Sequence, residues 1–134
     1  MIFFDILKDN TLINCFVFSR DLIILFSDYL RQKNIRYFFC GSDGGPAISY
    51  KSLELEPVIA SIEDMIIHID QVWFHNIDNN DARIYATTLT ADENYDEIEV
   101  EMTKEYVLKM LIGMLKICIE CQNTPDLELR MSAD

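Results

Sequence analysis

Polar and apolar residues alternate strictly from Glu97 to Met102, where the sequence reads Glu-Ile-Glu-Val-Glu-Met. Alternation with a period of two predicts a β-strand with three apolar side chains on one face and three carboxylates on the other. After Thr103, a suitable helix N-cap, the period becomes helical and stays so to Cys121. Its polar residues form one narrow stripe: Glu105, Lys109, Gly113, Lys116 and Glu120. We therefore expect this helix to be buried over most of its circumference, as the central core element.

The beginning of the chain predicts a β-hairpin and then a helix. Residues 2–7 and 12–18 are apolar strand-like segments, and the turn-forming pair Asp9-Asn10 separates them. Residues 19–34 follow with an N-capping serine, apolar residues at helical spacing and an asparagine at the expected end.

The middle of the chain predicts short strands and one more helix. Segments 36–40 and 47–50 have the composition of short strands. A helix is expected from Pro57, because proline suits a first helical position and apolar residues recur at helical spacing after it. The pattern does not fix where this helix ends. Residues 71–77 and 83–90 predict two further strands.

These elements predict an α+β fold with a mostly antiparallel sheet, about three helices and the long C-terminal helix packed on the sheet. Consecutive strands joined as hairpins, rather than strands alternating with helices, favour this class. The chain has 134 residues, which is typical of one domain, and we assign residues 1–125 to it. Residues 126–134 follow Pro125 and are expected to form a flexible C-terminal tail.

Composition excludes several classes of protein. Half of the residues are hydrophobic, which argues against disorder and favours a real core at this length. The longest apolar run is interrupted by Lys109 and Lys116 and is too short for a membrane span. The N-terminus lacks the basic segment of a signal peptide, so we expect a cytoplasmic protein whose four cysteines are reduced.

The acidic residues are concentrated in one part of the chain. The formal net charge is −12, which argues against binding to nucleic acid or to an anionic membrane. Residues 42–101 contain fourteen acidic residues and only two basic ones, Lys51 and Arg83, so this segment carries the whole excess. Such asymmetry predicts a polarised surface and favours a basic partner.

Six carboxylates lie within the ten residues from Asp92 to Glu101, with one tyrosine among them. Like charges crowded on one strand face oppose folding, so a function that needs negative potential would explain their presence. The alternative is a solvated strand and loop with no binding role. A calcium site is a third interpretation, but the spacing differs from that of an EF-hand loop. The predicted partner-binding residues are Asp92, Glu93, Tyr95, Asp96, Glu97, Glu99 and Glu101.

No motif in the sequence predicts catalysis, a metal or a cofactor. Cys118 and Cys121 lie at the end of a helix without a second ligand pair, so we interpret them as small buried residues. His75, with Asp78 and Asp81, is too loosely spaced to predict a metal site. Trp73, the single tryptophan, is either a core residue or an interface anchor.

In size, charge and α+β composition the chain resembles small acidic immunity proteins, which block bacterial toxins. This resemblance implies an acidic inhibitor, not an enzyme, that neutralises a basic toxin domain such as a nuclease. The alternatives are an acidic secretion chaperone for an effector and a small enzyme of unknown reaction. The sequence does not predict the oligomeric state or the identity of the partner.

Overall fold

The computed structural model describes residues 2–18, 47–89, 94 and 96–133. Within these ranges the chain is an α+β protein with three α-helices and two antiparallel sheets. The elements in chain order are β1 (Ile2–Lys8), β2 (Thr11–Phe18), β3 (Ile48–Lys51), the 3-10 helix η1 (Ser52–Glu54), α2 (Glu56–Ile67), α3 (Ile69–Asn76), the 3-10 helix η2 (Asp78–Asn80), β4 (Tyr85–Leu89), β5 (Glu97–Glu101), α4 (Lys104–Asn123) and β6 (Leu127–Ala133).

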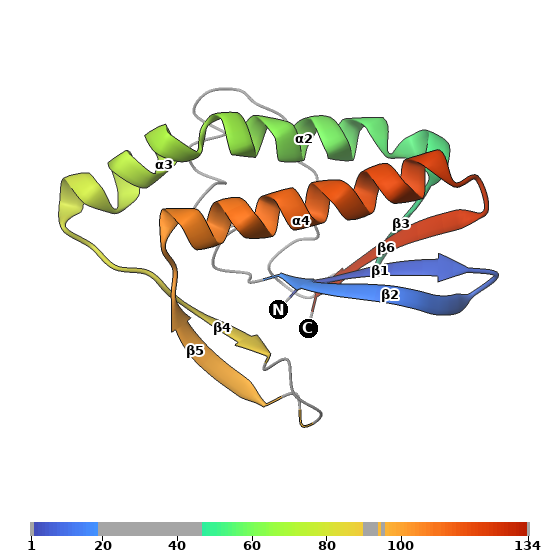
Figure 1. Ribbon diagram of the computed structural model, residues 1–134, viewed down its shortest axis with the longest axis horizontal. Helices are drawn as coiled ribbons and strands as arrows, with labels where there is room; N and C mark the ends of the chain where they lie inside the picture. Colours follow the sequence, from blue (N-terminus) through green and yellow to red (C-terminus); the bar gives the residue numbers. More distant parts are fainter. Residues whose placement is uncertain (1, 19–46, 90–93, 95, 134) are drawn as a thin grey trace.

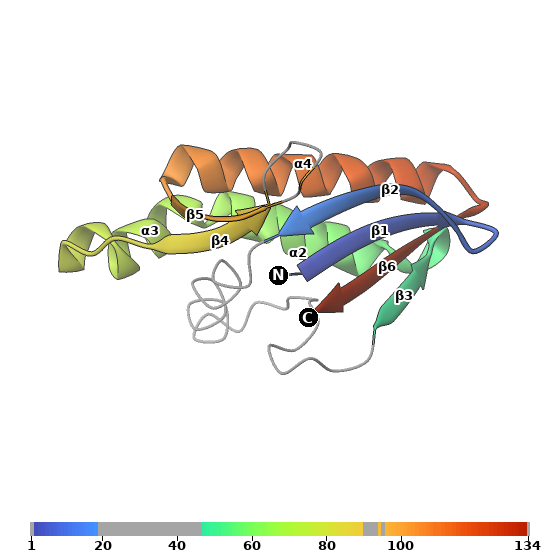
Figure 2. The ribbon, with the colours of Figure 1, turned by 90° about the horizontal axis from the view of Figure 1, so that it is seen from below.

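The larger sheet has the strand order β2-β1-β6-β3, and every neighbouring pair is antiparallel. Helices α2 and α4 lie side by side over one face of this sheet, as Figure 1 shows. The smaller sheet consists of β4 and β5 only, which project from the helix layer below the start of α4 in Figure 1. The end of β4 comes close to β2 of the larger sheet (Figure 2). The predicted class, the antiparallel sheet and the packed long helix are thus confirmed.

The β1–β2 hairpin has the two-residue turn that its sequence predicts. Asp9 and Asn10 have φ angles of 51° and 64°. Two consecutive positive φ angles belong to a type I′ turn, and Asp and Asn tolerate them better than other non-glycine residues. The turn fixes the register, so that Lys8 pairs with Thr11.

The core lies between the larger sheet and the two helices. Phe4 and Ile6 of β1 pair with Met131 and Leu129 of β6, and all four side chains are buried under the helices. Each such side chain contributes roughly 1.5–3 kcal/mol through its removal from water. Helix α4 contributes a buried face at helical spacing: Val107, Met110, Leu111, Met114, Cys118 and Cys121.

The exposed side of α4 is wider than the predicted polar stripe. Ile112 and Ile119 are each 38% exposed, so the expectation of burial over most of the circumference is wrong. The sheet and α2 cover one side of the helix, while its opposite side faces water along the polar stripe and these two isoleucines.

The predicted flexible tail is wrong for residues 127–133. These residues form β6, which lies between β1 and β3 inside the larger sheet. Leu127, Leu129 and Met131 alternate along it and are buried in the core. Both edges of β6 are paired, and one of its faces is covered by the helices, so it is an interior element of the fold.

The predicted strand at residues 71–77 is also wrong, because this segment belongs to α3. Ile69, Val72 and Trp73 are buried at steps of three and four residues, which is helical spacing. Strands at 47–50, 83–90 and 97–102 are confirmed as β3, β4 and β5, and the helix predicted from Pro57 is confirmed as α2. The helix predicted at 19–34 and the strand at 36–40 lie outside the described residues.

Candidate functional site

Three of the predicted site residues form one row of carboxylates on β5. Glu97, Glu99 and Glu101 alternate along the strand, so they point to the same face, and all three are exposed. We call these three residues the carboxylate row. Among the described residues its one ion pair joins Glu101 Oε1 to Arg83 Nε at 3.9 Å, and both side chains are about half exposed or more. An ion pair of this length between solvent-exposed side chains is weak, so it neutralises little of the charge of Glu101.

Glu97 and Glu99 have no ion-pair partner among the described residues. Asp96 is exposed and directly precedes β5 in the chain. Asp92, Glu93 and Tyr95 lie outside the described residues, so their role in binding stays a prediction. The structure therefore brings Glu97, Glu99 and Glu101 together, with Asp96 adjacent to them.

The opposite face of β5 becomes more buried toward α4. Ile98 is 42% exposed and Val100 is partly buried, whereas Met102, just beyond the strand, is 2% exposed. The Met102 N–H donates a hydrogen bond to the Ile84 carbonyl at 2.7 Å, which holds the end of β5 against the chain before β4. The distal part of the hairpin is thus open to water on the carboxylate face and, at Ile98, on the other face.

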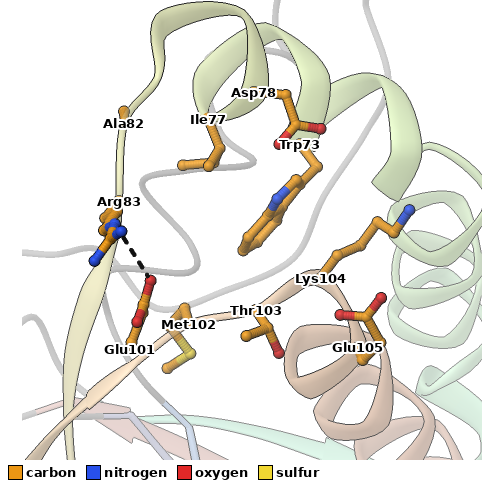
Figure 3. Close-up of a pocket in the computed structure, with 10 residues that line it drawn as sticks. All are labelled: Trp73, Ile77, Asp78, Ala82, Arg83, Glu101, Met102, Thr103, Lys104 and Glu105. Carbon is orange, nitrogen blue, oxygen red and sulfur yellow. Dashed lines mark ion pairs between the residues drawn. The ribbon is translucent and has the colours of Figure 1, made fainter.

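A pocket of about 410 Å³ lies at the base of this hairpin, where α3, the connection into β4 and the start of α4 meet. Figure 3 shows Ile77 and Met102 on the same side of the Trp73 indole, and all three residues are almost wholly buried. The rim of this Trp73 pocket is polar and charged. The rim residues include Asp78, Arg83, Glu101, Thr103, Lys104 and Glu105.

Short local interactions shape the Trp73 pocket. Thr103 Oγ1 accepts a hydrogen bond from the Tyr106 N–H at 3.1 Å and caps α4 at the pocket rim. Asp81 has a φ of 49° and, as the C-terminal cap of η2, turns the chain toward β4. The Ala82 N–H then donates to the Ile77 carbonyl at 2.9 Å, so the connection stays close to the end of α3.

The two cations of the Trp73 pocket each have an acidic partner. Lys104 Nζ lies 3.2 Å from Asp70 Oδ1 on α3, and this hydrogen bond and charge raise the pKa of Lys104. Arg83 pairs with Glu101 (dashed line in Figure 3). Asp78 and Glu105 form no ion pair among the described residues, but both carboxylates lie close enough to Lys104 to raise its pKa further. The pocket therefore has an apolar floor and surplus negative charge on its rim.

The sequence did not predict this pocket. Trp73 was expected on a strand, either as a core residue or as an interface anchor, and the structure confirms that it is a core residue. The pocket forms because α3 brings Trp73 beside the start of α4. The signal that was available is the spacing of Ile69, Val72 and Trp73, which places all three on one face of a helix.

The cysteines of α4 are buried, as predicted. Cys118 and Cys121 are free thiols with no exposed surface. Burial, with a smaller effect of the nearby Cys121, raises the pKa of Cys118 to about 12, and burial also raises the pKa of Cys121. A thiol with a raised pKa is a poor nucleophile and a poor metal ligand at neutral pH.

The described part of the chain contains no group of three or more His, Cys, Asp or Glu side chains placed to hold a metal ion. None of its helices is long and apolar enough to cross a bilayer. Comparisons with known protein families, curated proteins and solved structures found no match. The geometry of the carboxylate row and the Trp73 pocket is therefore the basis on which a function can be proposed.

Proposed function

We propose that this protein is an acidic inhibitor that binds and neutralises a basic protein partner. Its proposed role is that of a cytoplasmic immunity protein that blocks a bacterial toxin, with a nuclease as the expected class of toxin. The observation that carries the proposal is the carboxylate row: Glu97, Glu99 and Glu101 share one exposed face of a hairpin that forms its own two-stranded sheet.

The spacing of the row suits a cationic surface. Residues two apart on a strand are separated by about 7 Å, so the row presents a regular series of negative charges. Nucleases bind phosphates through clustered Lys and Arg side chains, because those contacts supply most of the affinity for nucleic acid. A rigid row of carboxylates can occupy the positions that phosphates would take and so exclude the substrate.

Charge also accounts for how such a partner would be captured. The excess of acidic residues between positions 42 and 101 creates a one-signed field around the hairpin. Fields of this kind raise association rates by about 10–1,000-fold at low salt. An inhibitor that must reach a toxin before the toxin reaches its substrate benefits from fast association more than from additional contact area.

The experiment begins by capturing the partner from the native cells with the tagged wild-type chain and identifying it by mass spectrometry. The triple variant Glu97→Gln, Glu99→Gln, Glu101→Gln is then compared with the wild type in association kinetics over a range of salt concentrations. We expect the variant to associate about tenfold more slowly at low salt, with a flatter salt dependence.

The control variant is Glu63→Gln, Glu120→Gln, Asp126→Asn, which removes the same charge from exposed positions outside the hairpin. We expect it to associate at close to the wild-type rate. Equal rates for all three proteins at low salt would show that the carboxylate row is not the binding site. Capture of the partner through an extended, unfolded segment would instead favour a secretion chaperone.

A further inference from the structure

We propose that the outer edge of β5 pairs with an extended strand of the basic partner, in which Lys or Arg residues alternate with apolar residues. This inference rests on the proposed function and adds the backbone geometry of the contact to it. The unpaired hydrogen-bonding groups of the β5 backbone carry the inference, and the carboxylates decide which strand can pair with them.

One edge of β5 has no partner strand among the described residues. β4 pairs with β5 from Tyr85↔Glu101 to Leu89↔Glu97, and no other described strand joins this sheet. β4 lies on the side of the hairpin nearer to β2, so the unpaired edge of β5 is the outer one (Figure 1). An unpaired edge presents N–H and C=O groups that can pair with a strand of another chain.

The unpaired backbone groups of β5 belong to the three glutamates of the carboxylate row. The Met102 N–H donates a hydrogen bond to the carbonyl of Ile84, the residue directly opposite in the β4–β5 register. In an antiparallel pair, opposite residues that exchange hydrogen bonds alternate with opposite residues that do not. Val100 and Ile98 therefore bond to β4, whereas the N–H and C=O groups of the row point to the outer edge.

The side chains of the row favour a basic strand at the same edge. A residue that pairs with one of these glutamates has its side chain on the carboxylate face, with its Cβ about 5 Å from that of the glutamate. A Lys or Arg at every second position would therefore meet one carboxylate each. The intervening residues would lie on the other face beside Ile98, which is 42% exposed, so apolar side chains fit there.

A second copy of the chain does not fit this edge. If two β5 strands paired through their outward-pointing groups, glutamates would lie directly opposite glutamates, because only the glutamates present those groups. Like charges directly opposite each other are destabilising. The carboxylates thus oppose self-pairing and favour a strand of opposite charge.

Two isomeric peptides test the pairing on the whole chain at low salt. One is a capped heptapeptide in which valine and arginine alternate, with arginine at its centre, and the other has the same residues with its arginines contiguous. Calorimetry should show about tenfold tighter binding of the alternating peptide. At about ten times its dissociation constant, this peptide should slow amide hydrogen exchange about tenfold at Glu97, Glu99 and Glu101.

Methylation of the peptide backbone separates strand pairing from charge. An N-methyl group on the central arginine removes a donor that faces β5, so binding should fall to that of the contiguous isomer. The same group on a neighbouring valine points away from β5 and should change the affinity by no more than about twofold.

Glu99→Pro and Glu99→Gln are a matched pair of variants. Both remove one charge, but only proline removes the outward N–H, and proline is tolerated in an edge strand whose N–H side faces solvent. We expect Glu99→Gln to keep the preference for the alternating peptide and Glu99→Pro to abolish it. Slow amide exchange at Ile98 and Val100 would show that β5 still pairs with β4. If proline disrupts that pairing, the methylated peptides decide.

The outcomes distinguish this inference from the proposed function. If the two isomers bind equally, methylation has no effect and the triple glutamine variant loses both, the inference is overturned but the row still binds cations. If the alternating peptide is preferred while the captured partner associates equally with the wild type and the triple variant, strand pairing stands and the proposed function fails. Dimerisation of the chain that slows exchange at Glu99 without peptide would also overturn the inference, because a second copy would then occupy the edge.

Discussion

The larger sheet and the β4–β5 hairpin each contain an ion pair between a strand carboxylate and an arginine, but the two pairs differ in distance and in exposure to water. On β1, Asp5 is only 9% exposed, and Arg130 Nη2 of the neighbouring strand β6 donates a hydrogen bond to its Oδ2 at 3.1 Å. On β5, Glu101 is exposed and lies 3.9 Å from Arg83, while Glu97 and Glu99 form no ion pair within the part of the chain that the structure describes. The nearly buried carboxylate of Asp5 is paired with a cation. The exposed carboxylates of the hairpin can still bind one.

The two regions also differ in how much of their apolar surface is buried. The inner face of the larger sheet is covered by α2 and α4, whereas Tyr85 and Ile98 of the hairpin are each more than 40% exposed. A region that buries little contributes little to stability, so its sequence is free to serve binding. This comparison predicts that the larger sheet carries the stability of the molecule and the hairpin carries its interactions.

The largest effect is expected from deletion of residues 127–134, which removes β6 from the interior of the sheet. Three buried side chains and the pairing with both β1 and β3 would be lost. At about 1.5–3 kcal/mol for each side chain, the loss approaches the whole stability of a typical domain. We expect the truncated chain to show no cooperative thermal unfolding by circular dichroism. A cooperative transition near that of the full chain would restore the interpretation of this segment as a tail.

The next largest effect is a difference in the free energy of unfolding between one substitution in the core and one in the hairpin. Leu111→Ala removes a fully buried side chain of α4 and should lower the free energy of unfolding by about 2–5 kcal/mol. Ile98→Ala, on the hairpin, should lower it by less than about 1 kcal/mol, because that side chain is already partly in water. Chemical denaturation measures both. Equal losses would show that the hairpin is part of the stabilising core.

Substitutions in the ion pairs Asp5–Arg130 and Glu101–Arg83 compare the larger sheet with the hairpin more directly. Arg130→Met leaves the nearly buried Asp5 without its cationic partner and should cost about 1–3 kcal/mol. Arg83→Met breaks a long, exposed pair and should change stability by no more than about 0.5 kcal/mol. Adding Asp5→Asn to Arg130→Met should recover part of the loss, which a double-mutant cycle would measure. A larger effect at Arg83 would reverse the comparison.

The pH dependence of the free energy of unfolding at alkaline pH should show whether water is excluded from the core around α4. The pKa of Cys118 is about 12 in the folded chain, against an ordinary value of 9.0. Between these values the unfolded chain holds fewer protons on this thiol, so the free energy of unfolding falls as pH rises, by up to about 1.4 kcal/mol per pH unit. Denaturation of the wild type and Cys118→Ala between pH 8 and 11, under reducing conditions, isolates this slope. If the free energy of unfolding had the same pH dependence in the wild type and in Cys118→Ala, Cys118 would not be protected from water.

Sequence patterns predicted most of the elements wherever local chemistry decides the structure. The turn at Asp9-Asn10 and the capped, periodic helix after Thr103 are local signals, and both are present in the structure. Leu127, Leu129 and Met131 also alternate as in a strand, but a segment that follows a proline near the end of a chain is commonly frayed. The segment 71–77 is rich in strand-forming residues, and its packing against the rest of the core decides in favour of a helix.

The candidate site was predictable only in part. The alternation from Glu97 to Glu101 was enough to place the carboxylates on one face of a strand. The Trp73 pocket could not be predicted in the same way, because its walls come from segments about thirty residues apart in sequence. Only tertiary packing shows that Trp73 and Glu105 border the same space.

The position of β1 between β2 and β6 predicts an order of events during folding. Its pairing with β2 requires only a two-residue loop, which can form within microseconds. Its pairing with β6 joins residues such as Asp5 and Arg130, which are 125 positions apart in sequence. Closing so long a loop is slow, because its entropy must be lost before the contacts form. Until then β1 has one unpaired edge, so partner strands from other copies of the chain compete with β6, and refolding yield should fall as protein concentration rises.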